Sequence, residues 1–154
     1  MHRVRNAKLQ RWIAVWGILG LSVLYSGCSK PGVDYAPVSG RITIDGAAIE
    51  GARIVLVPDQ QVAEGAQPVA SGTTDADGRF VLKTLTPEKE LVDGAVVGPN
   101  RATVATQIVE LNDRGAERVI RKEMLGPEYT NGGKLSVDVP AAGLDALELN
   151  LQGK

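Results

Sequence analysis

Hydrophobic residues follow two different patterns along this chain of 154 residues. Near the N-terminus they form one nearly continuous run, Trp12 to Tyr25, which follows a stretch with several basic residues. From Val38 onward they alternate with polar residues in short stretches, which is the period of a β-strand with one buried face. The pattern therefore predicts an N-terminal apolar segment followed by a domain built from many short strands.

Several stretches of the second region have strand character, and turns rich in Gly or Pro separate them. Phe80 and Leu82 fall on one face of their stretch, and Ala102 and Val104 fall on one face of theirs. Many short alternating strands between such turns are typical of an antiparallel β-sandwich. The strands are expected over residues 38–44, 53–57, 69–74, 79–84, 101–110, 135–139 and 147–151.

The segments between these strands are expected to be turns and loops, with one exception. Leu111 to Met124 is dense in charge, and the spacing of its apolar residues predicts a short surface helix. Asp45-Gly46 and the segment 75–78 contain the Asp and Gly that tight turns favour. Loops are expected over residues 59–68, 85–100 and 125–133.

The apolar run from Trp12 to Tyr25 has the layout of a secretory signal. Basic residues precede it, and small residues follow it before the only cysteine of the chain, Cys28. A helix that crosses a bilayer needs roughly 20 residues, and this run is shorter, which suits a signal peptide. Two other interpretations stay open: an ordinary cleaved signal that leaves Cys28 as a free thiol, and an N-terminal anchor that is retained.

The end of the run resembles the lipobox of bacterial lipoproteins. Ser26, Gly27 and Cys28 match it, whereas Tyr25 stands where the family usually has leucine. The resemblance implies cleavage between Gly27 and Cys28 and attachment of fatty acids such as palmitate to the Cys28 thiol. In that family, Ser29 after the cysteine is compatible with transfer to the outer membrane. We expect residues 1–27 to be the signal peptide, 28–37 a flexible tether and 38–152 the folded domain.

Removal of the signal would change the chemistry that the chain can perform. The 17 basic residues would fall to 13 against 18 acidic ones, a net charge of about −5 that argues against nucleic acid as a partner. His2, Trp12 and Trp16 would be lost, and a single cysteine cannot form an intramolecular disulfide. Without histidine or a free thiol the domain lacks the general base of Ser-His-Asp and Cys-His mechanisms and the usual zinc ligands. Paired carboxylates could still act as catalytic groups, but no pair stands in a context that suggests a cleft. We therefore expect no enzyme activity, no cofactor and no small-molecule substrate.

Two motifs of the strand region resemble a known family. VSGRITIDG begins at Val38 and TDADGRF begins at Thr74, and both are similar to motifs of carboxypeptidase regulatory-like domains. The resemblance implies a single Greek-key sandwich of the transthyretin-like (prealbumin-like) type. It implies no peptidase activity, because in carboxypeptidases this domain is an accessory to the catalytic one. Pro127 and Tyr129 fit a P-x-Y segment of bacterial lipoproteins with one such domain. The matching residues are Val38, Gly40, Ile42, Asp45, Gly46, Gly51, Ala52, Ile54, Thr74, Asp75, Gly78 and Phe80, among which Gly40, Gly46 and Gly78 are interpreted as fold determinants.

Three features could carry a binding function, and each has a structural alternative. Asp75 and Asp77 resemble the start of a calcium loop, but the further oxygen ligands do not follow, which favours a tight turn. Tyr129 could stack on a sugar ring if it were exposed, although a buried, hydrogen-bonded tyrosine is more common. The charged segment Asp113 to Glu123 could dock a partner protein or be a solvated face.

These observations lead to one hypothesis and one alternative. The chain is expected to be a non-catalytic lipoprotein that Cys28 anchors to the bacterial cell envelope, at the outer membrane. Its β-sandwich would have a structural role or would bind an envelope protein. In the alternative, the domain is a small carbohydrate-binding module that recognises an envelope glycan.

Overall fold

The computed structural model describes residues 32–62, 66–132 and 134–154, and Val33–Lys154 form one compact unit. The expected signal peptide, Gly27 and Cys28 lie outside the described residues. Within them, the secondary structure consists of strands and a single turn of helix. The elements in order are β1 (Tyr35–Ala36), β2 (Val38–Ile44), β3 (Ala47–Ala48), β4 (Arg53–Pro58), β5 (Val69–Thr73), β6 (Arg79–Val81), β7 (Lys83–Leu85), β8 (Leu91–Asp93), β9 (Ala95–Val96), β10 (Gly98–Ala105), β11 (Ile108–Leu111), β12 (Glu117–Arg121), α1 (Pro127–Thr130), β13 (Leu135–Val139) and β14 (Leu144–Leu151).

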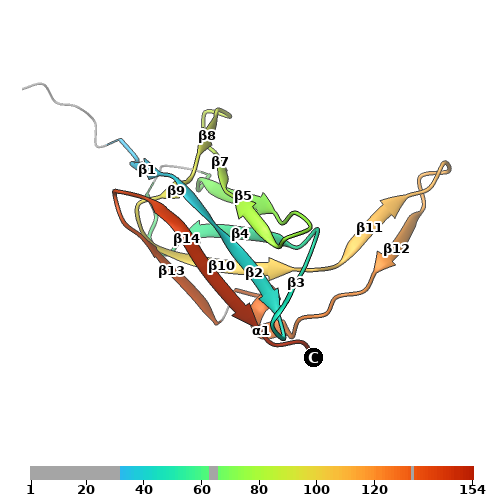
Figure 1. Ribbon diagram of the computed structural model, residues 1–154. Coiled ribbons are helices and arrows are strands. Elements are labelled where there is room, and N and C mark those ends of the chain that lie inside the picture. Colours follow the sequence, from blue (N-terminus) through green and yellow to red (C-terminus); the bar gives the residue numbers. More distant parts are fainter. Residues whose placement is uncertain (1–31, 63–65, 133) are drawn as a thin grey trace, which may run out of the picture. The chain divides into compact units, whose positions relative to one another are not determined.

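Two sheets contain most of these strands (Figure 1). The larger sheet has six strands in the order β13-β10-β4-β5-β7-β8. In the smaller sheet, β2 pairs with β14 along one edge and with β3 and β6 along the other. Two short pairs, β1–β9 and β11–β12, are separate from these sheets. Buried residues of both sheets form one hydrophobic core, which confirms the predicted all-β sandwich.

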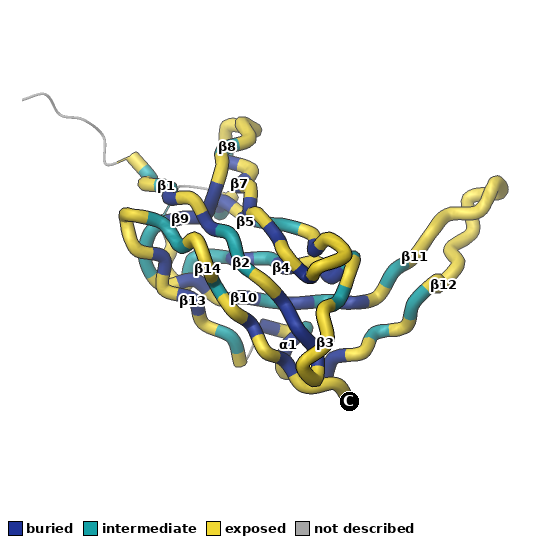
Figure 2. Tube along the Cα trace, viewed as in Figure 1, coloured by how far each residue is buried: buried dark blue, intermediate teal, exposed yellow. Residues whose placement is uncertain are grey.

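The core forms because the apolar residues of each strand alternate with polar ones and therefore share one face. Ile42 of β2, Ile54 and Leu56 of β4 and Val104 of β10 are fully buried. Figure 2 shows buried positions alternating with more exposed ones along these strands. Burial of one such side chain contributes roughly 1.5–3 kcal/mol to folding, so packing is the main source of stability.

One strand pair departs from the antiparallel arrangement. β14 runs parallel to β2, with Leu149 beside Ile42. A parallel pair needs a crossover connection, and the chain between β2 and β14 provides it by passing through the larger sheet. The register shifts between Leu144 and Leu147, and the Leu147 carbonyl lies so close to Gly40 that a Cβ atom there would overlap it. Gly40 is therefore required by the close approach of the two backbones.

The strand predicted over residues 79–84 divides at Leu82 and contributes to both sheets. Its first part, β6, pairs with β2 of the smaller sheet, and its second part, β7, pairs with β5 of the larger sheet. Phe80 and Leu82 are both buried, as predicted. The strand thus connects the two layers of the sandwich at one side.

The prediction that residues 85–100 are mostly loop is wrong. This segment contains β8, β9 and the start of β10. β8 and β9 have three and two residues, which is too short for a periodicity to be visible in the sequence. Gly94, between them, donates its amide hydrogen to the Leu82 carbonyl and accepts a hydrogen bond from the Thr84 hydroxyl. Hydrogen bonds to a neighbouring segment, rather than the local sequence, determine the conformation here.

The folded unit begins earlier than the sequence predicts. β1 lies inside the range 28–37 that the composition assigns to a tether, and it pairs antiparallel with β9. In addition, the Val97 amide donates to the Asp34 carbonyl at 2.9 Å. The chain is therefore fixed to the sandwich from Asp34 onward, so residues 34–37 belong to the folded domain.

Candidate interaction site

The charged segment that was predicted to form a surface helix forms a β-hairpin instead. β11 and β12 pair antiparallel and extend away from the sandwich (Figure 1). The side-chain oxygen of Asn112 accepts hydrogen bonds from the Arg114 and Ala116 amides, and Gly115 has a φ of +74°. This Asn-x-x-Gly turn is the sequence signal that the helical spacing of the apolar residues obscured. Residues 108–121 are called the arm from here on.

The outer part of the arm is fully exposed. Every residue from 111 to 120 is exposed, and Leu111 has 70% of its surface accessible (Figure 2). Val109 and Val119 lie opposite each other on the two strands, and both are exposed. An isolated two-stranded hairpin is only marginally stable in water, because it buries little apolar surface. The arm therefore has exposed apolar surface that is available for contact. Its two outer strand edges also have no neighbouring strand among the described residues.

Glu123 fixes the base of the arm to the sandwich. Its carboxylate accepts hydrogen bonds from the amides of Thr106, Gln107 and Leu125, at 2.9, 3.2 and 2.9 Å. It also accepts a hydrogen bond from the buried Thr106 hydroxyl at 2.5 Å. The oxygen of this hydroxyl in turn accepts a hydrogen bond from the Met124 amide at 2.8 Å. One carboxylate therefore joins the chain that follows β10 to the chain that follows β12.

Arg121 makes a second connection at the base of the arm. Its Nε atom donates to the Thr106 carbonyl and its Nη1 atom to the Glu50 carbonyl, both at 2.6 Å. The Nη2 atom is buried and has no hydrogen-bond partner within the described part of the chain. The bond to Glu50 holds the arm against the turn that precedes β4. The base of the arm is thus well fixed, while its outer part is free to contact another molecule.

Glu123 should make the stability of the protein sensitive to acid. Burial alone would raise the pKa of its carboxyl, but the hydrogen bonds from Thr106, Leu125 and Gln107 outweigh burial and hold the pKa below the ordinary value of 4.5. The folded state therefore favours the ionised form, and its stabilising contribution is present above that value and is lost as the pH falls through the folded-state pKa. We expect the melting temperature of the wild type to fall more steeply than that of Glu123→Gln below about pH 4.5, as measured by circular dichroism. Parallel curves would contradict this assignment.

The calcium candidates Asp75 and Asp77 lie in a tight turn between β5 and β6. The Asp75 Oδ1 atom accepts hydrogen bonds from the Asp77 and Arg79 amides at 3.0 and 2.8 Å, and Gly78 has a φ of +76°. The Asp75 carboxylate is therefore bound by the backbone, as the turn interpretation predicts. Across residues 32–62, 66–132 and 134–154, no group of three His, Cys, Asp or Glu residues is placed to hold a metal ion.

We expect calcium to leave the melting temperature of the wild type unchanged. Asp75→Ala should lower the free energy of unfolding by about 1 kcal/mol, because it removes two hydrogen bonds that close the turn. The loss should be the same in calcium and in a chelator, as measured by chemical denaturation. A melting temperature that rises by several degrees with calcium in the wild type but not in Asp75→Ala would instead indicate a calcium site.

Tyr129, the candidate for sugar stacking, lies in α1 and is buried in the core cluster. Its hydroxyl accepts a hydrogen bond from Lys134 Nζ at 3.2 Å, and this Nζ atom is 4.8 Å from the centre of the ring. The geometry is that of a buried, hydrogen-bonded tyrosine with a cation on its ring. Its ring therefore has no open face for a sugar to stack on.

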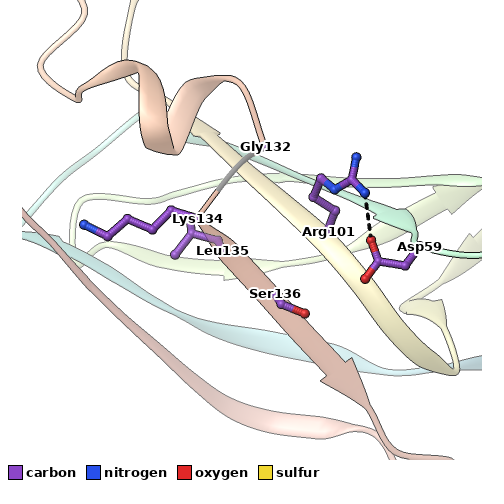
Figure 3. Close-up of a pocket in the computed structure, with 6 residues that line it drawn as sticks. All are labelled: Asp59, Arg101, Gly132, Lys134, Leu135 and Ser136. Carbon is purple, nitrogen blue, oxygen red and sulfur yellow. Dashed lines mark hydrogen bonds and ion pairs between the residues drawn. The ribbon is translucent and has the colours of Figure 1, made fainter.

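A shallow hollow of about 190 Å³ lies near α1 (Figure 3). It is lined by Asp59, by Arg101 of β10 and by Gly132, Lys134, Leu135 and Ser136 in and before β13. Arg101 and Asp59 form an ion pair of 3.3 Å on one side of it, and Lys134 points away from that pair. Pockets that bind small molecules usually have at least about 300 Å³ and a mostly apolar lining. The small volume and the paired charges make this hollow a weaker candidate than the arm.

Comparisons with known proteins do not assign a family. No protein-family model matches the chain, and no curated protein matches it. Among solved structures, a 9R-lipoxygenase from Cyanothece matches with a TM-score of 0.40 and 11% identity, over 77% of this chain and 16% of the lipoxygenase chain. A similarity this low carries no inference about fold or chemistry. The resemblance to carboxypeptidase regulatory-like domains therefore stays a prediction.

Proposed function

We propose that this protein is a non-catalytic lipoprotein of the bacterial cell envelope, whose β-sandwich presents the arm to a partner protein. The observation that carries the proposal is the contrast within the arm. Its base is held by Glu123 and Arg121, whereas every residue from 111 to 120 is exposed. A fixed base with an exposed apolar outer part is a suitable arrangement for binding another protein.

The physical reason to expect a protein partner is the open edge of each strand of the arm. Unpaired backbone amides and carbonyls on such an edge can pair with an added strand, which is a common mode of protein recognition. Leu111, Val119 and Ile120 would lose exposed apolar surface in such a complex. A third strand would also bury apolar surface that a two-stranded hairpin leaves exposed to water.

The lipid anchor is supported by the sequence at Ser26, Gly27 and Cys28, and it would be compatible with the position of the arm. β1, where the chain enters the sandwich, and the arm lie at opposite ends of the folded unit (Figure 1). A protein anchored before β1 would therefore present the arm on the side away from its attachment. In the described part of the chain, no helix is long and apolar enough to cross a membrane.

The absence of catalysis is supported by the side chains that remain after cleavage at Cys28. The chain from Cys28 onward contains no histidine and no tryptophan, and acylation would block its only thiol. General-base and nucleophilic mechanisms usually depend on histidine or a free thiol. The domain is therefore proposed to act through binding alone.

The partner proposal is tested by site-specific photo-crosslinking in intact cells. A photoreactive residue replaces Leu111 in the arm or, as a matched control, Val81, which is also an exposed apolar strand residue, with 62% of its surface accessible. We expect a discrete crosslinked species from position 111 only, and we expect Val119→Ser to reduce it. Equal crosslinking from both positions, or none from position 111, would contradict the proposal.

The anchor is tested separately by the intact mass of the protein recovered from membranes. A diacylated or triacylated N-terminus at Cys28 would support the lipoprotein proposal. An unmodified N-terminus at Cys28 would indicate an ordinary cleaved signal with a free thiol. A chain that retains Met1 would indicate an uncleaved anchor.

A further inference from the structure

Three exposed apolar residues form a row across β5, β7 and β8 of the larger sheet. Val69 lies beside Leu85, and Leu85 lies beside Leu91, in the register of the sheet. Leu85 and Leu91 have 53% and 65% of their surfaces accessible, whereas Thr84, whose side chain has the opposite direction, is fully buried. The three residues therefore share the outer face of the sheet, and they are called the outer row below. Contiguous exposed apolar residues of this kind often mark a contact surface.

The outer row lies close to the point where the chain enters the sandwich. β9, which follows β8 after a single residue, pairs with β1. β8 also contacts β1 directly. Burial, and to a smaller extent the nearby Glu88 carboxylate in the loop between β7 and β8, raise the pKa of the Tyr35 hydroxyl. Figure 1 shows β1, β7 and β8 at the same end of the folded unit, opposite the arm.

Only a short stretch of chain joins this end of the sandwich to Cys28. Asp34 is hydrogen-bonded to Val97 and is six residues from Cys28. A fully extended chain spans at most about 3.6 Å per residue, so Asp34 can lie no more than about 22 Å from Cys28. Leu91 is four residues from Ala95, which pairs with Ala36. A chain anchored by acyl groups on Cys28 would therefore keep this end of the sandwich within reach of the membrane surface.

We propose that the outer row is a membrane-contact surface that rests on the lipid bilayer and orients the anchored domain. This inference rests on the lipid anchor of the proposed function. The partner is the apolar–polar boundary of the bilayer, in which exposed leucine and valine side chains lose contact with water. The arm extends from the opposite end of the folded unit (Figure 1) and would stay clear of the lipid.

The charges around the outer row indicate which lipids it would contact. Lys83 forms an ion pair with Asp93 at 3.2 Å, and the loop between β7 and β8 contains Glu88, Lys89 and Glu90, for a net charge of −1. The surface has no excess of cations, so anionic lipids should not strengthen the contact. We expect zwitterionic phosphatidylcholine vesicles to be sufficient, and salt to have little effect.

The test uses a single tryptophan as a probe of depth in the bilayer. Both natural tryptophans are replaced, Trp12→Phe and Trp16→Phe, so that the background has none. Leu91→Trp then places a probe in the outer row, and Leu111→Trp places a matched probe at a similarly exposed position in the arm. The full-length product recovered from membranes is reconstituted into phosphatidylcholine vesicles with brominated acyl chains, which quench tryptophan at the depth of the bilayer boundary.

The expected result is a large difference between the two probes. Fluorescence of Leu91→Trp should fall by roughly half or more, and that of Leu111→Trp by less than about one tenth, because only the first would reach the acyl chains. Equal quenching of the two, or stronger quenching of Leu111→Trp, would overturn the inference.

The N-terminal mass separates failure of this inference from failure of the proposed anchor. Acylated Cys28 without quenching of Leu91→Trp would leave the anchor intact and reject the membrane contact. If Cys28 is recovered as a free thiol, the anchor proposal fails, and the thiol is coupled to a maleimide lipid before the same comparison. If Met1 is retained, the chain is reconstituted through its own apolar segment. Quenching of Leu91→Trp and Leu111→Trp is then compared as before, and the comparison still tests whether the outer row contacts the bilayer.

Discussion

The Gly40→Ala variant is expected to lose about 4 kcal/mol of unfolding free energy, a large part of the stability of a typical domain. A Cβ atom at this position would overlap the Leu147 carbonyl of β14 and would come within 2.8 Å of the tip of the Phe80 ring. The first of these obstacles is backbone, which cannot rotate away as a side chain can. Relief would require separation of β2 from β14, the pair that holds the smaller sheet together.

Gly46→Ala is the matched control for this experiment. Gly46 has a φ of +82°, but the space around its missing Cβ atom is open to 4 Å. Alanine there should cost only the strain of a left-handed conformation, about 1 kcal/mol. Urea denaturation followed by circular dichroism measures both variants. A Gly40→Ala variant as stable as Gly46→Ala would show that the Leu147 carbonyl of β14 does not lie as close to Gly40 of β2 as described.

The Glu123→Ala variant is expected to lose about 3 kcal/mol of unfolding free energy. Its carboxylate accepts four hydrogen bonds from three residues, and alanine would leave several of these donors without a partner. Thr106 is fully buried, so water could not easily replace the lost bonds to its hydroxyl and amide. We also expect the base of the arm to open, because Glu123 joins the ends of β10 and β12.

Hydrogen exchange of the Thr106, Gln107 and Leu125 amides reports on that opening directly. Their protection should fall in Glu123→Ala, and crosslinking from position 111 should fall with it if a fixed base is needed for partner binding. Glu110→Ala, which removes an exposed carboxylate from the same arm, is the control and should change stability by less than about 0.5 kcal/mol. Unchanged protection in Glu123→Ala would mean that Arg121 alone holds the arm.

The strands that the sequence predicts well are those with a long alternating pattern. β2, β13 and β14 lie where the alternation places them, because a half-buried strand imposes a period of two on its own residues. β4 lies where its run of β-branched residues predicts a strand. Phe80 and Leu82 are in the core for the same reason. The sequence also suggested correctly that Asp75 closes a turn, since Asx hydrogen bonds are made within a few residues.

The two strands of the arm could not be predicted from the spacing of their apolar residues. The apolar positions of the segment 111–124 fit a helical spacing, and no core contacts impose the period of a strand, because both faces of the hairpin are exposed. The Asn112 turn was a local signal, but the connection that fixes the hairpin is remote. Glu123 bonds to Thr106, 17 residues earlier, and Arg121 bonds to Glu50, 71 residues earlier.

The sequence by itself determined an all-β domain behind an apolar N-terminal segment, since alternation, turn residues and uninterrupted apolar runs are properties of neighbouring residues. The tertiary structure alone decided which strands are neighbours, including the parallel pairing of β2 with β14 and the division of residues 79–84 between two sheets. It also brought Val69, Leu85 and Leu91 into one row and fixed the base of the arm through Glu123 and Arg121. These arrangements depend on contacts between residues far apart in the chain, for which a local pattern contains no information.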